Sequence, residues 1–272
     1  MLFRSLKFAE MNVPAVHQGG WFDTFAQGTI DAFVGRQHQG GPGSRGKQKL
    51  IMGPWDHGGW RRPEVGELRF PNNGLPSAYS TERWLGYHLQ GVDNGIMREP
   101  AVVYYVMGDT SDPKAPGNQW RQAADWPVRA VPTPFYFHTG GELSRDKPPR
   151  PDAYREYTFD PRNPCPTIGG ANLTIDRGPR NQNPIETRPD VLTFTTEPLA
   201  EPLEVTGRIK ARVYVSSSAV DTAPKAFRTA ASSASSPIMS SIMPWRAVRT
   251  ASFLAFRSGA NPLTISTIFV IW

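Results

Sequence analysis

Two short segments of this 272-residue chain carry side chains that could take part in hydrolysis. Asp23 directly follows the residues Gly-Gly-Trp-Phe, and His57 directly follows Gly-Pro-Trp-Asp. Hydrolysis of an ester or amide by a serine needs a nucleophile, an imidazole base and a carboxylate that fixes the imidazole tautomer. Asp23 and His57 supply two of these three groups, and no suitable serine precedes them. The sequence therefore predicts two-thirds of a Ser-His-Asp triad.

The elements predicted around this pair would bring both residues to one edge of a sheet. In order, they are the end of a helix over 1–12, a short apolar strand over 13–17 that runs into a Gly-Gly turn, a helix over 24–33, a polar loop over 36–48 and a strand over 49–52. Strand, helix, strand favours parallel pairing with a right-handed crossover. Asp23 and His57 would then follow the carboxyl ends of neighbouring strands, where open α/β sheets place their sites.

Each candidate residue also has a plainer interpretation. Asp23 could cap the helix that follows it, and His57 could be a packed loop histidine. Asp56 could itself be the acid of another scheme. Ser44 lies between the acid and the histidine on the polar loop, and Pro42 stands where a Gly-x-Ser-x-Gly elbow needs its first glycine. Spacing alone leaves the alternatives for Asp23 and His57 open.

The second half of the chain has a different pattern. A helix is predicted over 80–89, and after residue 100 apolar strands alternate with turns rich in Pro, Gly and Asn. This pattern is typical of an all-β sandwich. We expect a domain boundary near residue 100, which makes residues 1–100 an α/β unit and residues 101–221 a β-domain. The strands expected there cover 101–107, 134–138, 154–159, 191–195 and 207–215.

Composition excludes several classes of protein. The net charge is +6, but all 24 acidic residues and 25 of the 30 basic residues lie in the first 221 positions. No basic stripe or run is present, which argues against a nucleic-acid partner. The sequence predicts no signal peptide, no membrane span and a cytoplasmic protein. A single cysteine, Cys165, and the lack of metal-ligand spacing predict neither a disulfide framework nor a metal or other cofactor.

Residues 222–272 form a segment of another character. They contain no Asp or Glu, and the alternation typical of a sandwich stops just before them. Two explanations compete, a disordered low-complexity tail and translation in the wrong reading frame. The abrupt change favours the frameshift, and we assign the segment no fold or function.

Several motifs together resemble one known family. The segments Gly-Gly-Trp-Phe-Asp-Thr-Phe and Lys-Leu-Ile-Met-Gly-Pro-Trp-Asp-His-Gly-Gly are similar to the acid and histidine signatures of the Xaa-Pro dipeptidyl-peptidase/cocaine-esterase (CocE/NonD, S15-type) serine hydrolases. Residues 84–95 and 99–108 resemble the helix before that family's C-terminal domain and the start of its jelly-roll β-domain. The resemblance implies that Asp23 is the triad acid and His57 the base. It also implies that Phe25 lies against the acyl portion of the substrate.

The resemblance also implies what this sequence lacks. The family's nucleophile elbow and a tyrosine of its oxyanion hole lie upstream of the acid, and nothing before Asp23 matches either. We therefore expect the C-terminal remnant of an α/β-hydrolase domain followed by a partial jelly roll, inactive alone. The expected partner is a small ester, amide or peptide substrate, with a homo-oligomer or a complementing N-terminal fragment as further possibilities. The alternative is a non-catalytic jelly-roll module that binds carbohydrate or a protein partner.

Overall fold

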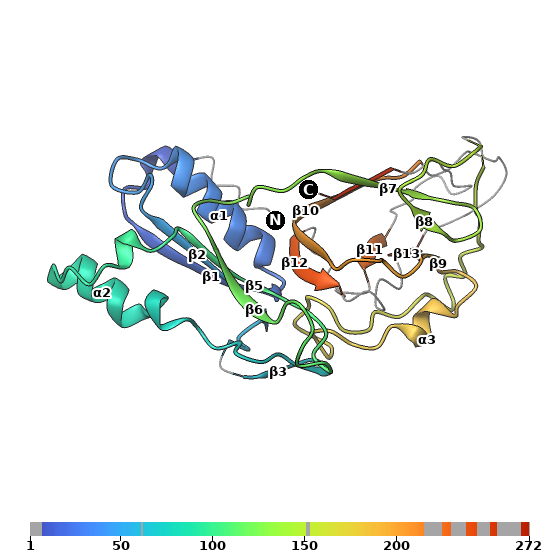
Figure 1. Ribbon diagram of the computed structural model, residues 1–272, viewed down its shortest axis with the longest axis horizontal. Coiled ribbons are helices and arrows are strands. Elements are labelled where there is room, and N and C mark those ends of the chain that lie inside the picture. Colours follow the sequence, from blue (N-terminus) through green and yellow to red (C-terminus); the bar gives the residue numbers. More distant parts are fainter. Residues whose placement is uncertain are drawn as a thin grey trace.

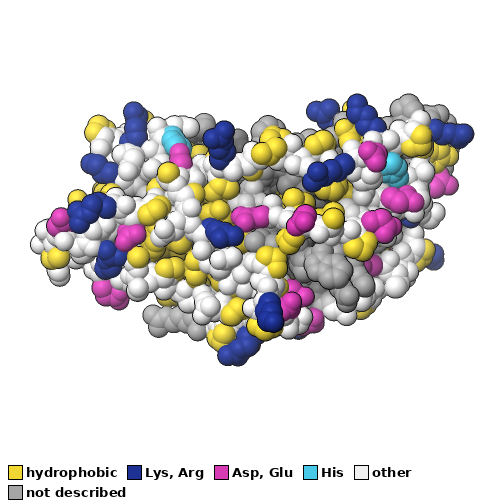
Figure 2. Space-filling view, in the orientation of Figure 1, with side chains coloured by type: hydrophobic (Ala, Val, Ile, Leu, Met, Phe, Trp, Pro, Cys, Tyr) yellow, Lys and Arg dark blue, Asp and Glu magenta, His cyan; other side chains and the backbone are white. Residues whose placement is uncertain are grey.

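The computed structural model of the chain describes residues 7–60, 62–150, 153–214, 225–229, 238–243, 251–254 and 268–271. Figure 1 shows a sheet with helices on the left and a group of β-strands on the right. This arrangement confirms the predicted class, an α/β part followed by an all-β part. None of the described helices is both long and apolar enough to cross a membrane. On the face shown in Figure 2, basic and acidic side chains are interspersed.

The left-hand sheet has the strand order β1-β2-β5-β6. Strand β1 (Ala15–Phe22) is followed by helix α1 (Ala26–Gln39) and strand β2 (Gln48–Asp56). β1 pairs with β2 in parallel, as the strand–helix–strand pattern predicted. β2 is buried along its whole length because β1 and β5 (Val102–Val106) flank it and α1 lies along one face of the sheet (Figure 1). Parallel strands covered in this way are mostly apolar, and Leu50, Ile51 and Met52 form the apolar run of β2.

The bounds of the first elements differ from those expected. The Gly-Gly pair is not a turn, because β1 continues through it to Phe22. A Cβ atom on Gly20 would lie 2.1 Å from the carbonyl oxygen of Trp55, so Gly20 lets β1 and β2 approach closely. The helix continues six residues past the predicted end at Phe33. Of the segment predicted as helix over 1–12, residues 1–6 lie outside the described part, and Phe8–Glu10 form the 3-10 helix η1.

The core of this part lies between the sheet and α1. Its largest cluster joins buried side chains of β1, α1, β2 and β5, among them Trp21, Phe22, Ile30, Phe33, Leu50, Met52 and Tyr105. A second cluster on the sheet includes Ile51, Trp55, Tyr79 and Val103. The apolar residues that predicted strands and a helix from the sequence are therefore the ones that hold the sheet and the helix together.

Strand β6 (Gln119–Ala123) was not predicted, and it pairs antiparallel with β5. β5 in turn pairs in parallel with β2. One sheet thus runs across residue 100, where a domain boundary was expected, and the division of the chain there stays a prediction. Helix α2 (Thr81–Gln90) confirms the helix predicted over 80–89. The 3-10 helices η2 (Ser77–Tyr79) and η3 (Ile96–Arg98) flank it.

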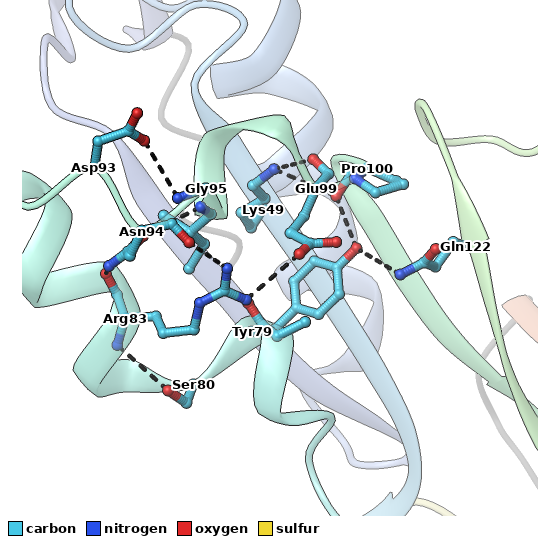
Figure 3. Close-up of polar contacts among 12 residues, drawn as sticks. Lys49, Tyr79, Ser80, Arg83, Asp93, Asn94, Gly95, Glu99, Pro100 and Gln122 are labelled. Atoms are coloured by element: carbon cyan, nitrogen blue, oxygen red, sulfur yellow. Dashed lines mark hydrogen bonds and ion pairs between the residues drawn. The ribbon is translucent and has the colours of Figure 1, made fainter.

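A polar network holds the connection between α2 and β5, and Figure 3 shows it. The guanidinium of Arg83 donates to the carbonyl of Asn94, and its Nη1 lies 3.4 Å from a carboxylate oxygen of Glu99. Lys49 of β2 donates to the carbonyl of Glu99, and Tyr79 donates to the carbonyl of Pro100 over 3.0 Å. These bonds satisfy carbonyls next to the buried sheet, and they fix where β5 begins.

Alkaline pH is expected to weaken this network. Burial raises the pKa of Tyr79 to about 12, with a further contribution from the Glu99 carboxylate. A group whose pKa is raised on folding stabilises the fold below its unfolded pKa, near 10 for tyrosine, and loses that contribution as pH rises toward 12. We expect urea unfolding to show Tyr79 contributing ~2 kcal/mol less at pH 12 than at pH 9.

Tyr79→Phe, which cannot ionise, should show a shallower loss of stability between pH 9 and 12 than the parent. Tyr154→Phe is the matched control, because Tyr154 is half exposed, and its curve should follow that of the parent. Equal slopes for Tyr79→Phe and the parent would show that Tyr79 does not titrate in this way.

The right-hand part consists mainly of antiparallel strands. Strands β7 (Thr133–Phe137), β9 (Leu192–Phe194) and β10 (Leu203–Arg212) confirm three of the strands predicted there. β7 also pairs with the short β8 (Leu143–Ser144). Apolar side chains of these strands, among them Phe135, Phe137, Leu192 and Phe194, form a core together with Tyr157. The strand predicted over 154–159 is wrong: Tyr157 packs into this core, but the segment has no regular secondary structure.

Smaller elements connect the two parts. The hairpin β3 (Glu64–Val65) and β4 (Leu68–Arg69) follows the histidine loop, and the short helix α3 (Asn183–Glu186) precedes β9. Ile209 of β10 packs against the cores of both parts.

Most of the segment 222–272 lies outside the described residues. Its described stretches are the strands β11 (Lys225–Thr229), β12 (Ile238–Met243), β13 (Ala251–Leu254) and β14 (Ile268–Ile271). They pair in the two sheets of order β12-β10-β14-β7-β8 and β11-β13-β9. These stretches are strands in the structure, and the two explanations for the segment, a disordered tail and a frameshift, both stay predictions.

Candidate active site

Asp23 lies directly after the carboxyl end of β1, at the turn into α1. Its backbone N–H donates to the carbonyl of Gly20 over 3.0 Å, and its Oδ1 accepts a bond of 2.9 Å from the backbone N–H of Phe25. The carboxylate thus satisfies a backbone donor near the start of the helix, much as the capping interpretation expected. Its side chain is only 14% exposed. Local structure therefore fixes where the carboxylate points, and both of its oxygens can still accept a bond from a partner.

That partner is His57, which directly follows β2. Because β1 and β2 are parallel neighbours and Phe22 is in register with Asp56, the two residues emerge at the same sheet edge. His57 Nδ1 lies 3.2 Å from both carboxylate oxygens of Asp23. An ionised carboxylate can only accept, so Nδ1 carries the proton and Nε2 presents a lone pair. The imidazole is 45% exposed, and none of the described residues bonds to Nε2.

Phe25 adds an apolar surface beside the pair. Its ring centroid lies 5.2 Å from that of His57 with an interplanar angle of 69°, an edge-to-face contact. The Phe25 side chain is 54% exposed although it is large and apolar. An exposed aromatic ring packed against a solvent-facing imidazole can contact a molecule bound at Nε2.

Asp56 has other partners, so it is not the acid that pairs with His57. It is 7% exposed, and its carboxylate lies 3.2 Å from Arg62 and 3.0 Å from Arg177. Two guanidinium groups therefore neutralise this buried charge. Sequence reasoning missed Arg62 and Arg177, and Arg177 lies 121 positions away, where no local pattern could indicate the contact.

Ser44 is a structural residue. It is fully buried, and its Oγ accepts a bond of 3.0 Å from the side-chain amide of Gln48. The same amide group lies 3.0 Å from the ring of His17 through its oxygen, and burial lowers the pKa of that histidine. A buried hydroxyl held in this way cannot present itself to a substrate, which agrees with the departure from the elbow pattern at Pro42.

A second histidine–carboxylate pair lies on the surface. His38 in the last turn of α1 has its Nε2 3.2 Å from Oδ1 and 3.1 Å from Oδ2 of Asp125. Its side chain is as exposed as that of His57, but Asp125 is 44% exposed whereas Asp23 is 14% exposed. Exposed pairs contribute little to stability. His38 and Asp125 therefore provide a control pair with similar distances in a different setting.

Comparisons with known proteins show the family of the chain. Residues 4–59 match the model of the X-Pro dipeptidyl-peptidase (S15 family), and residues 94–224 match that of the X-Pro dipeptidyl-peptidase C-terminal non-catalytic domain. The cocaine esterase of Rhodococcus sp. (strain MB1 Bresler) is 32% identical over 227 residues, which cover 77% of this chain and 36% of that protein. The chain belongs to the Xaa-Pro dipeptidyl-peptidase/cocaine-esterase (CocE/NonD, S15-type) family of serine hydrolases. It spans about a third of the length of the curated relatives it matches.

Solved structures share the fold. An α-amino acid ester hydrolase superposes with a TM-score of 0.56 at 21% identity, covering 96% of this chain and 54% of that one. An aminopeptidase from a marine sediment Thaumarchaeota archaeon superposes with a TM-score of 0.55 at 19% identity, covering 95% of this chain and 47% of that one. At these identities the likeness concerns the fold alone.

Proposed function

We propose that this chain supplies the acid and the base of a Ser-His-Asp triad that hydrolyses esters or amides. The observation that carries the proposal is the bond between Asp23 and His57 at the carboxyl ends of adjacent parallel strands. Membership of a serine hydrolase family supports it. The substrate would be a small ester, an amide or a peptide, and the serine would come from a segment outside these 272 residues.

The geometry gives each residue one step. Nε2 of His57 would take the proton of the serine hydroxyl as it attacks the carbonyl carbon, and would return that proton to the leaving group. Asp23 would keep the proton on Nδ1 and stabilise the imidazolium formed in between. Phe25 would pack against the acyl portion of the substrate, because its exposed ring borders His57.

The sheet supports the proposal that the first part is the remnant of an α/β-hydrolase domain. β1 stands at the end of the strand order, so among the described residues it has a paired neighbour on one side only. Its last four residues are nevertheless buried. An apolar strand with an open edge favours pairing with a further strand. The second part would be a partial jelly roll, in line with the antiparallel strands of its two sheets.

We expect the chain alone to be inactive, because a triad without its serine and oxyanion donors loses most of its rate acceleration. The test uses a fusion enzyme. In it, the part of the cocaine esterase that lies before its region of similarity to this chain is joined to residues 7–272. The fusion should hydrolyse p-nitrophenyl acetate, and the chain alone should not. His57→Ala should abolish the activity of the fusion and His38→Ala should preserve it. Hydrolysis by the chain alone that disappears in His57→Ala would contradict the proposal.

One observation favours a second function. Residues 94–224 match a domain described as non-catalytic. The chain could therefore be a binding module for carbohydrate or a protein partner, with the first part as its support. A folded fusion without esterase activity, together with retention of the chain on a polysaccharide matrix, would favour this function over hydrolysis.

A further inference from the structure

We infer that Arg177 positions the active-site histidine through the carboxylate of Asp56. The inference rests on the proposed function, and it gives a role in the reaction to a region described as non-catalytic. Asp56 ends β2 and directly precedes His57. Its carboxylate is nearly inaccessible to solvent and lies 3.0 Å from Nε of Arg177. A buried carboxylate has to be paired, so its guanidinium partners determine where it can lie.

The position of the Asp56 carboxylate is coupled to the loop that carries His57. The carbonyl of Asp56 accepts a bond of 3.2 Å from the N–H of Gly59, which closes a turn around His57. A Cβ atom on Gly59 would lie 2.0 Å from Oδ1 of Asp56, so the carboxylate occupies the space that a side chain would take. The carboxylate and the turn therefore form one packed unit, and His57 is one of the residues of that turn.

Arg177 is delivered to this unit by a segment bonded to the β3–β4 hairpin, and we call residues 177–181 the docked segment. The N–H of Glu67 donates to the carbonyl of Pro179 over 2.9 Å, and the N–H of Asn181 donates to the carboxylate of Glu67 over 2.8 Å. A Cβ atom on Gly66 would lie 2.2 Å from the carbonyl oxygen of Pro179. In Figure 1 β3 lies at the lower edge, between the two parts of the molecule.

Arg62 also pairs with Asp56, but it differs from Arg177 in two respects. Arg62 lies six residues after Asp56 in the chain, and its side chain is 56% exposed against 32% for Arg177. The better-buried guanidinium has less competition from water. Arg177 also belongs to the region matched at residues 94–224, whereas His57 belongs to the region matched at 4–59. Arg177 thus connects the two matched regions at the histidine loop.

The first test measures kinetics in the fusion enzyme. Arg177→Ala is expected to lower kcat for p-nitrophenyl acetate by about 10- to 100-fold with KM changed less than about twofold, because small displacements of a catalytic group cost rate. Arg177→Lys keeps the charge and should recover part of the loss. Arg188→Ala is the matched control, since Arg188 pairs with the buried carboxylate of Asp190 and lies outside the docked segment. A kcat for Arg177→Ala equal to that of the parent, or an equal fall in Arg188→Ala, would overturn the inference.

The second test needs no activity and uses the chain alone. With ¹⁵N-labelled histidine, NMR should show His57 as one Nδ1-protonated tautomer in the parent, as the bond to Asp23 requires. Arg177→Ala should mix its tautomers and leave His38 unchanged, and Arg177→Lys should give an intermediate result. Unchanged His57 signals in both variants would overturn the inference. An inactive parent fusion would refute the proposed function instead, and the NMR result would still decide the role of Arg177.

Discussion

Asp23→Asn in the fusion enzyme is expected to lower kcat by about 10,000-fold while leaving the fold intact. An amide in place of the carboxylate can donate to Nδ1, which favours the tautomer with the proton on Nε2 and removes the lone pair that the base needs. The loss would appear in kcat more than in KM, because the imidazolium exists only after proton transfer. Steady-state hydrolysis of p-nitrophenyl acetate, with circular dichroism to verify folding, measures it.

Asp125→Asn is the matched control for this prediction. It makes the same chemical change in a pair with similar distances, His38 and Asp125, on the exposed surface. We expect its kcat to stay within about twofold of the parent, since exposed pairs contribute little. If both variants lost activity equally, or if Asp23→Asn kept more than a tenth of the parent rate, Asp23 would not be the triad acid.

The position of this pair could be predicted because local patterns determine it. Apolar segments around a helix predict two parallel strands, and parallel neighbours bring the residues after their carboxyl ends together. Asp23 and His57 needed only the order of elements, so errors in strand bounds did not affect them. The contact between Arg177 and Asp56 spans 121 positions and depends on how a loop docks on a hairpin. No period or motif in a single sequence contains that information.

The errors in the fold have similar physical causes. Strand β6 was missed because most of its residues are polar and partly exposed, and backbone pairing with β5 holds it in place. The strand expected over 154–159 reflects a real burial pattern, because Tyr157 enters the core. Burial of a side chain does not require a backbone partner in a sheet, so alternation alone overpredicted a strand there. Turn propensity is a local property, so the Gly-Gly pair at 19–20 predicts a turn although β1 continues through it.

The glycine at position 20 gives the largest expected effect on stability. Gly20 is in register with Gly53, and a Cβ atom on Gly20 would lie 2.1 Å from the carbonyl oxygen of Trp55. The obstacle is backbone, so no side-chain rotation can relieve it, and β1 and β2 must move apart. We expect Gly20→Ala to lower the free energy of unfolding by about 3 kcal/mol or more, as measured by urea denaturation.

Gly28→Ala makes the same chemical change with the opposite expected sign. Gly28 lies on the exposed side of α1, and a Cβ atom there meets nothing within 4 Å. Alanine in a helix should raise the free energy of unfolding by about 0.5 to 1 kcal/mol.

Gly20 lies only three residues before Asp23, so strands forced apart there also separate the carboxylate from His57. Fusion enzyme carrying Gly20→Ala should therefore lose kcat even at temperatures where it remains folded, whereas Gly28→Ala should keep it. Equal stability of the two variants would show that the close approach of β1 and β2 does not constrain the site.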